Sequence, residues 1–225
     1  MNIVYILLAI AVLVFGGSYI YMRNLKEKIK NGRNDMREFF YSAIENGTLN
    51  EMDEMGHTPL MIAIKGKFNK SALKIIDAGA DVNVKGETGE QAIHLAAHHS
   101  PMVVIERLIE KGADINSVDM QGCTPLWYAA QNRRDDMVSL LIKSNADINA
   151  IDTQFGLSPL MIAAQNGAYK IVDILLENKA DKLITATDFG TAYDIAKLRL
   201  NGNIKENKKA VNELERMVEI LKIEE

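Results

Sequence analysis

The sequence from Gly122 to Asn149 reads GCTPLWYAAQNRRDDMVSLLIKSNADIN, and altered copies of this stretch stand before and after it. Its opening Thr-Pro-Leu slot begins in turn at Thr58, Gln91, Thr124, Ser158 and Thr191, so the stretch recurs about every 33 residues. The Ala-Asp pair near the end of each copy keeps the same spacing, with its aspartates at Asp81, Asp114, Asp147 and Asp181. Both series place a single extra residue between Asn149 and Ser158. A fixed period of this kind predicts an array of structural repeats.

The residue types in each slot predict the same local structure in every copy. A Thr or Ser followed by Pro starts a helix, because the hydroxyl accepts a hydrogen bond from a free amide and Pro lacks only a donor that the first turn cannot use. Met137, Val138 and Leu141 have the apolar spacing of a second helix. Gly79 and Gly112 follow second helices, where a left-handed residue often ends the helix. Each unit is therefore expected to form a helix, a turn, a helix and an extended hairpin.

The period and the Thr-Pro-Leu signature resemble those of the ankyrin repeat family, over roughly Gly56 to Ile223. The resemblance implies an all-α ankyrin-repeat solenoid whose helix-turn-helix units are joined by β-hairpin fingers. Four repeats are expected at residues 53–85, 86–117, 118–150 and 151–183. His94 keeps the histidine of the family signature, and the other repeats have Met61, Trp127 and Met161 in that slot.

Both ends of the array are expected to carry caps, because the terminal units of a solenoid need a polar outer face. Residues 34–52 are predicted to form an N-terminal capping helix, resembling the first half of a unit whose second helix is shortened to Thr48–Met52. Residues 184–225 are predicted to form a degenerate fifth repeat and a C-terminal cap. The final helix there is expected to bury Val211, Leu214, Met217, Val218 and Leu221.

The chain begins with an apolar segment, IVYILLAIAVLVFGGSYIYM, at residues 3–22, which contains no charged residue. Such a run spans about 30 Å as a helix and predicts a single transmembrane helix. Residues 23–33 form a basic juxtamembrane linker, so the positive-inside rule places the amino terminus outside and the repeats in the cytoplasm. A cleaved signal peptide is disfavoured, because no basic residue precedes the apolar run.

The charge distribution disfavours a nucleic-acid-binding protein, and the cysteine content excludes a disulfide-dependent fold. Residues 23–37 carry six basic and two acidic side chains, which leaves 28 acidic against 20 basic side chains elsewhere. An acidic repeat domain disfavours nucleic-acid binding. The single cysteine, Cys123, cannot form an internal disulfide, which excludes a disulfide-dependent fold. It is expected to be a partly exposed thiol in a repeat turn, with a redox or adduct-forming site as the alternative.

Few residues point to chemistry. His94, His98 and His99 lie close together on one predicted helix, and two of them have the spacing to share a metal. The Glu of a His-Glu-x-x-His site is absent, however, and His94 is better explained by hydrogen bonding within the repeat. The sequence also lacks a phosphate-binding Gly-rich loop, a dinucleotide fingerprint and a Gly-x-Ser-x-Gly elbow. No catalytic residue, metal, cofactor or small-molecule substrate is therefore expected.

In the ankyrin family, hairpin tips and the exposed ends of the first helices line a concave face that binds partner proteins. The resemblance assigns this role to Glu54, Met55, His57, Lys65, Glu87, Thr88, Glu90, His98, His99, Met120, Gln121, Cys123, Trp127, Gln131, Asn132, Gln154, Phe155, Leu157, Gln165 and Asn166. Met120, Phe155 and Leu157 are apolar where contact with solvent is expected, which suits an interface. Alternatively, Phe155 packs against Leu157 and the neighbouring finger.

The sequence therefore predicts a non-catalytic, membrane-anchored module that binds a partner protein beside the cytoplasmic face. An exported repeat domain, periplasmic or extracellular, that protects or inhibits an enzyme is the first alternative. A metal-dependent enzyme built on His94, His98 and His99 is the second.

Overall fold

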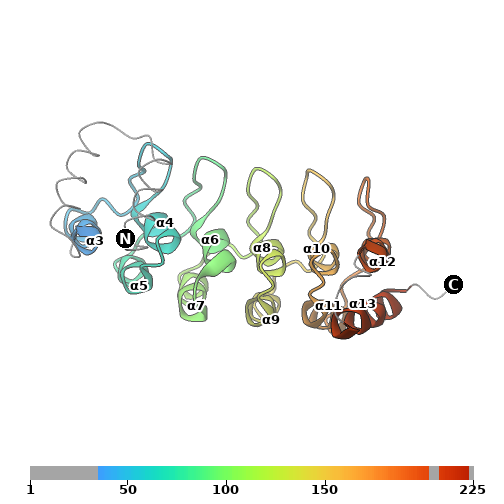
Figure 1. The fold of residues 1–225 in the computed structure, drawn as a ribbon. Coiled ribbons are helices and arrows are strands. Elements are labelled where there is room, and N and C mark those ends of the chain that lie inside the picture. Colours follow the sequence, from blue (N-terminus) through green and yellow to red (C-terminus); the bar gives the residue numbers. More distant parts are fainter. Residues whose placement is uncertain (1–34, 203–207, 223–225) are drawn as a thin grey trace, which may run out of the picture.

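The computed structural model describes residues 35–202 and 208–222, and the chain there folds as a row of paired helices (Figure 1). The predicted transmembrane helix at residues 3–22 and the linker at residues 23–33 lie outside these residues. Within the described ranges, no helix has both the length and the apolar content needed to cross a membrane. The helices are α3 (Asp35–Glu45), α4 (Pro59–Lys65), α5 (Asn69–Asp77), α6 (Ala92–His99), α7 (Met102–Glu110), α8 (Pro125–Gln131), α9 (Asp135–Lys143), α10 (Pro159–Asn166), α11 (Tyr169–Glu177), α12 (Ala192–Gly202) and α13 (Lys208–Leu221).

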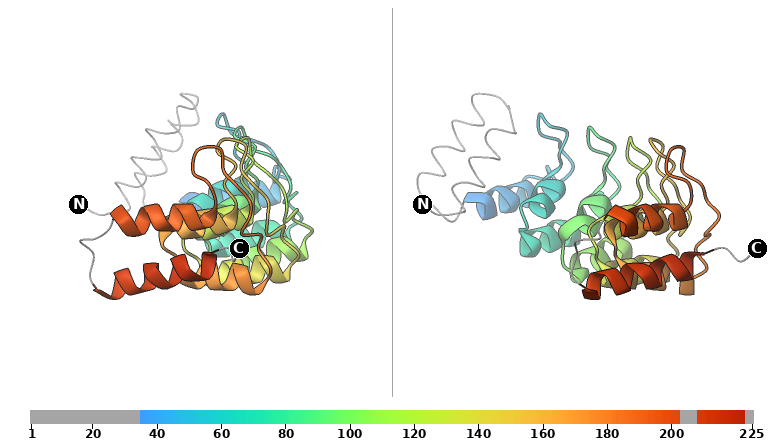
Figure 2. Two further views of the ribbon diagram at one scale, coloured as in Figure 1. Left: turned by 90° about the vertical axis from the view of Figure 1, so that its right-hand side faces the viewer. Right: turned by 45° about the vertical axis from the view of Figure 1, so that its right-hand side comes forward.

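The helices form two rows, with extended loops projecting on one side (Figures 1 and 2). The inner row, next to the loops, consists of α4, α6, α8, α10 and α12, and the outer row includes α5, α7, α9 and α11. The helices of a pair contact each other and helices of adjacent pairs; for example, α8 contacts α6, α9 and α10. Packing between successive units is the architecture of a solenoid, in which each unit buries its apolar face against its neighbours.

The inner helices begin where the sequence predicts. The hydroxyls of Thr58, Thr124 and Ser158 accept hydrogen bonds from the third amide of α4, α8 and α10, at 3.2–3.3 Å. In α6, where Gln91 replaces the hydroxyl residue, Nδ1 of His94 accepts from the Gln91 amide at 3.1 Å. His94, the third residue of α6, thus reaches back to the amide of the N-cap residue, which is the reciprocal bond of a capping box.

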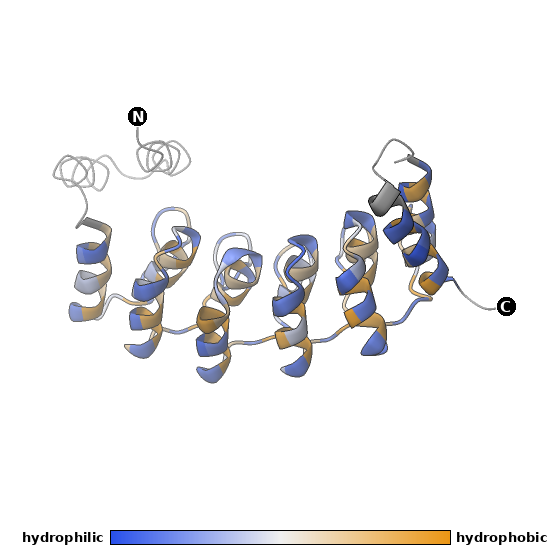
Figure 3. Cartoon of the chain, turned by 60° about the horizontal axis from the view of Figure 1, so that its bottom comes forward, coloured by the Kyte–Doolittle hydropathy of each residue, from blue (hydrophilic) through white to orange (hydrophobic). Residues whose placement is uncertain are grey.

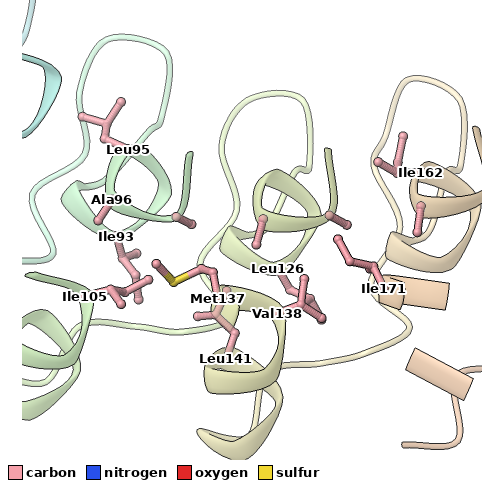
Figure 4. Packing of buried hydrophobic residues seen from close by; sticks show 14 of the residues in the cluster. Ile93, Leu95, Ala96, Ile105, Leu126, Met137, Val138, Leu141, Ile162 and Ile171 are labelled. Atoms are coloured by element: carbon pink, nitrogen blue, oxygen red, sulfur yellow. The ribbon is translucent and has the colours of Figure 1, made fainter. Parts of the chain in front are cut away.

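The core is a continuous layer of aliphatic side chains between the helix pairs. Ile93 of α6 and Ile105 of α7 lie close together, and Met137 of α9 points toward them (Figure 4). Small residues such as Ala129 and Ala130 are fully buried in α8 where neighbouring helices approach. Along each helix, hydrophobic residues alternate with hydrophilic ones (Figure 3), because each helix buries one face and leaves the other in water.

A left-handed residue follows each outer helix from α5 to α11. Gly79 and Gly112 have φ values of 93° and 83°, and Asn145 and Lys179 adopt φ values of 66° and 65° in the same slot. Lys179 thus adopts the left-handed conformation that glycine favours in this slot. Because a side chain in this conformation costs about 1 kcal/mol relative to glycine, the chain bears this strain at two of its four junctions.

An asparagine ladder fastens each unit to the next. Oδ1 of Asn83 accepts from the amide of Asp114 at 2.9 Å, and Nδ2 of Asn83 donates to the carbonyl of Gly112 at 2.9 Å. Equivalent bonds to an aspartate amide are made by Asn50, Asn116 and Asn149, to Asp81, Asp147 and Asp181 at 2.7–2.9 Å. The ladder ends at Leu183, which occupies the next asparagine slot and lacks a side-chain acceptor.

The N-terminal cap differs from its prediction in one respect. The predicted helix is present, and it buries Phe40 and Ala43, with Phe40 in the hydrophobic core. However, Thr48–Met52 forms a turn and extended chain rather than a shortened helix. Gly47 after α3 has a φ of 72°, like the residues that end the outer helices, and Asn50 begins the ladder. Helix α3 therefore corresponds to the second helix of a unit, and its assignment to the first half was wrong.

The C-terminal cap consists of α12 and α13, which pack against each other and against α10 and α11 (Figure 2). The predicted apolar face of α13 is confirmed, because Leu214, Met217 and Leu221 are buried. Nζ of Lys182 donates to the carbonyl of Ile220 at 3.2 Å and so binds the carboxyl end of α13. The cap thereby covers the apolar side of the last helix pair.

Candidate functional site

Five loops, here called fingers 1 to 5, lead into the inner helices, and each is closed by one backbone hydrogen bond. They span residues 53–57, 86–90, 119–123, 152–157 and 186–190. Finger 4 is one residue longer than the others, where the sequence places its inserted residue. The expectation of β-hairpins was wrong: the described residues contain no regular strand, only an isolated bridge between Ala186 and Gly190. A single pairing across a tight turn does not extend into a strand ladder.

Buried carboxylates fix the shape of the fingers. In finger 4, Oδ1 of Asp152 accepts from the amides of Gln154 and Phe155 at 2.9 and 2.7 Å, and Oδ2 accepts from the amide of Leu157 at 3.1 Å. Oδ1 of Asp119 accepts from two amides of finger 3 in the same way. These charge-assisted bonds hold the finger backbones in one conformation without any partner.

Neighbouring fingers are also bonded to each other. In each of fingers 3, 4 and 5, one backbone amide donates to a carbonyl of the finger before it. The bonds run from Met120 to Thr88 at 3.0 Å, from Thr153 to Gln121 at 2.8 Å and from Thr187 to Phe155 at 3.1 Å. Fingers 2 to 5 therefore form a continuous wall beside the inner helices. We call this surface, made by the fingers and the exposed ends of the inner helices, the inner face.

The two apolar fingertip residues differ in their surroundings. Met120 is 74% exposed and projects from finger 3 into solvent. Phe155 is 37% exposed, and its ring meets the ring of Phe189 from finger 5 edge to face, with centroids 5.9 Å apart. Phe155 thus packs on the neighbouring finger and still presents part of its ring to solvent.

Two other predictions of exposure were wrong. Leu157 is only 5% exposed, because its amide is drawn onto Asp152 and its side chain joins the hydrophobic core. Cys123 is 2% exposed, because it lies at the base of finger 3 directly before the cap of α8. Burial raises the pKa of the Cys123 thiol to about 12. The thiol is therefore neutral at physiological pH and poorly suited to redox chemistry.

A hollow of about 200 Å³ lies on the inner face around fingers 3 to 5. It brings together predicted site residues from two repeats, among them Trp127 and Phe155. The residues that line it are Gln121, Cys123, Trp127, Gln131, Asp152, Gln154, Phe155, Leu157, Ile162, Gln165 and Phe189. The indole N–H of Trp127 is buried and has no acceptor within the described chain.

The remaining predicted residues are spread over the inner face. Asn132 and Asn166 are partly buried, and their side-chain amides donate to the carbonyls of Tyr128 and Gln131 at 2.9 and 3.1 Å. Their side-chain amides are therefore used within the repeats and are less available to a partner protein. The other residues, exposed or partly exposed in repeats one and two, are Glu54, Met55, His57, Lys65, Glu87, Thr88, Glu90, His98 and His99.

Sequence reasoning missed several residues of this surface. Ile162 and Phe189 line the hollow, although neither was selected from the sequence. Exposed apolar side chains also stand beside the fingers at Met52, Val118 and Ile151, which are 43–49% exposed. These three positions are separated by whole repeats, so aligning the slot before each finger would have found them.

The three clustered histidines do not share a site. Both ring nitrogens of His94 are used within the repeat, since Nδ1 accepts from Gln91 and Nε2 lies 3.0 Å from the carbonyl of Ser117. His98 and His99 instead face each other, with their Nδ1 atoms 2.8 Å apart. Among the described residues, no group of three or more His, Cys, Asp or Glu side chains is placed to hold a metal. The structure therefore does not bring the three histidines together as one set of ligands.

Acidification should destabilise the fold through histidines that are buried or partly buried. Burial lowers the pKa of His57, His94 and His99. Because free histidine titrates near pH 6.5, the unfolded chain binds more protons than the folded chain as the pH falls through that value. Stability is therefore retained above about pH 6.5 and lost below it. His94 alone contributes up to about 1.4 kcal/mol per pH unit.

Urea unfolding at pH 7.5 and pH 5.5 measures this effect, with His94→Gln as the comparison. The variant should be less stable at pH 7.5, since it loses a bond to the Ser117 carbonyl, but should lose less stability than the wild type on acidification. An equal loss in the two proteins would mean that His94 does not contribute to the acid sensitivity.

Comparison with protein families agrees with this geometry. A model described as ankyrin repeats (3 copies) matches residues 67–152, and a model described as ankyrin repeat matches residues 155–188. Together they cover more than half of the 225 residues. No curated protein matches the chain. Repeats of this kind form protein–protein interaction modules and are generally non-catalytic. The period, the paired helices, the fingers and both family matches together establish that the chain belongs to the ankyrin repeat family.

Proposed function

We propose that this protein is a single-pass membrane protein that holds a partner protein beside the cytoplasmic face through the inner face of its repeats. The observation that carries the proposal is the wall of hydrogen-bonded fingers, on which Met120 and part of Phe155 are exposed. A surface fixed before binding loses little conformational entropy when a partner docks. The side chains on the fingers then determine which partner is bound.

The membrane part of the proposal is supported by the sequence alone. Residues 3–22 are uncharged and long enough to cross a bilayer as a helix, and basic residues follow only on the carboxyl side. Residues 34–225 would then comprise the amino-terminal cap, the repeats at 53–183 and the carboxyl-terminal cap. With a linker of only residues 23–33, the bound partner would lie close to the membrane surface.

The proposal is tested in cells with the full chain carrying a tag after Glu225. Crosslinking, solubilisation and purification through the tag should recover one dominant protein. On sealed spheroplasts, externally added protease should leave the tag intact, because the repeats lie inside. Digestion of the tag would reverse the orientation and favour an exported repeat domain, whereas a tag released as a soluble protein would refute the membrane anchor.

Matched substitutions test whether the inner face is the contact surface. Met120→Asp places a charge on an exposed fingertip, and it should reduce partner recovery about tenfold or more without unfolding the repeats. Val103→Asp makes the same chemical change on the outer helix α7, where Val103 is 46% exposed, and recovery should persist. Equal recovery with both variants would show that the partner does not use this part of the inner face.

A further inference from the structure

The hollow on the inner face is too small for a typical cofactor. It encloses about 200 Å³, whereas small-molecule sites usually measure about 300–1,000 Å³. Its apolar lining comes from Trp127, Phe155, Leu157, Ile162 and Phe189. Space of this size suits one large apolar side chain, the kind of anchor on which protein interfaces depend.

The lining of the hollow presents no free charge to an occupant. Its ionisable side chains are those of Asp152 and Cys123. The carboxylate of Asp152 is buried and already accepts three backbone amides of its own finger. The thiol of Cys123 is buried and neutral, because burial raises its pKa to about 12. A charged side chain entering the hollow would lose its water without meeting an opposite charge, which is costly.

Four glutamines surround the apolar lining in two rows. Gln121 and Gln154 stand on fingers 3 and 4, while Gln131 and Gln165 stand at the exposed ends of α8 and α10. All four residues are exposed, and within the described chain no side-chain amide among them hydrogen-bonds to protein. A glutamine amide carries both donors and an acceptor, which match the N–H and C=O of a peptide unit.

This arrangement is confined to the carboxyl-terminal half of the array. The slot held by Gln131 and Gln165 in repeats three and four is occupied by Lys65 and His98 in repeats one and two. The same face is therefore ionisable at one end and amide-rich at the other. Only the amide-rich end adjoins the hollow.

Building on the proposed function, we propose that the hollow receives one large apolar side chain from an uncharged, extended segment of the partner protein, while the surrounding glutamines bind the backbone of that segment. An extended segment directs alternate side chains to opposite faces, so one side chain enters the hollow while its flanking peptide groups lie over the two glutamine rows. A sugar is a poorer fit, because the Phe155 and Phe189 rings stand 81° apart and give no flat stacking surface.

The test uses a library of displayed short random peptides, selected against the full chain in lipid nanodiscs. Enriched peptides should share one large apolar residue with uncharged neighbours. Synthetic copies should bind Phe155→Ala and Gln131→Glu about tenfold more weakly or worse, the first through loss of the hollow wall and the second through a new desolvated charge. Glu106→Gln, at an exposed position of the outer helix α7, also changes one charge and should bind as the wild type does.

The other outcomes are distinct. Enrichment of charged peptides, no enrichment, or binding unaffected by both hollow variants would overturn the proposal. Binding to a glycan array in place of peptides would assign the hollow to a carbohydrate and overturn it as well. If the crosslinked cellular partner is recovered undiminished with both hollow variants while Met120→Asp abolishes its recovery, the inner face binds the partner without using the hollow. If no partner is recovered even with the wild type, the result contradicts the proposed function, and the peptide selection alone then tests the hollow.

Discussion

Replacing Ile105 by alanine should destabilise the protein by about 2–5 kcal/mol, one of the two largest effects expected from a single substitution. Ile105 of α7 is fully buried and lies close to Ile93 of α6, with Met137 of α9 pointing toward both (Figure 4). The truncation removes apolar contacts and leaves a cavity where the second and third repeats meet. Since each unit depends on its neighbours, the damage should spread to both sides of this junction.

Urea unfolding followed by circular dichroism and by Trp127 fluorescence measures the loss. Trp127 is the only tryptophan and lies in the third repeat, so it reports on one side of the altered junction. Val103→Ala is the control, because Val103 is on the same helix but 46% exposed, and its effect should stay within about 0.5 kcal/mol. Similar losses in the two variants would show that burial at this junction does not determine stability.

Replacing Met217 by aspartate should remove the C-terminal cap from the array. Met217 is 1% exposed, and the new carboxylate would be buried without a partner at a cost of several kcal/mol. Helix α13 can avoid this cost by detaching from α11 and α12. The loss of stability is therefore limited to the free energy that α13 contributes by packing on these helices. Burial of Leu214, Met217 and Leu221 suggests about 3–5 kcal/mol, after allowance for the entropy of ordering the helix.

Hydrogen exchange of the amides in α12 and α13 distinguishes detachment from global unfolding. In Met217→Asp these amides should exchange much faster, while those of α8 stay protected. Glu215→Asp, at an exposed position of the same helix, should leave exchange unchanged. Protection of α13 in Met217→Asp would mean that the helix tolerates the charge and is not held by its apolar face.

The repeat architecture was predictable because its local signals agree with one another. The Thr-Pro start of α8 is both a cap and a slot of the repeat period, so each observation supports the other. His94 was correctly expected to hydrogen-bond within the repeat, since its slot is tied to the helix start. The left-handed turn at Lys179 followed from the glycines found at the same slot in earlier repeats.

Contacts between residues that are not neighbours in the sequence explain what the sequence did not reveal. Leu157 was expected in solvent because it lies in a loop, but the carboxylate of Asp152 draws the finger back and turns the side chain into the core. The hollow was not foreseen because Phe189 completes it from the fifth unit, a whole repeat beyond Phe155. The correspondence of α3 to the second helix of a unit would have been found by extending the asparagine series back to Asn50.

The asparagine ladder also bears on how such a chain can change in evolution. Each rung joins one unit to the next through backbone groups and a single side chain, and the fingertip residues take no part. If one repeat between Asn50 and Asn149 were duplicated or deleted, the same asparagine bonds could form again at the new junction. The array could therefore gain or lose a repeat without a change in its fingertip residues. A repeat added after Leu183 would lack this bond, because leucine has no side-chain acceptor, unless an asparagine replaced Leu183.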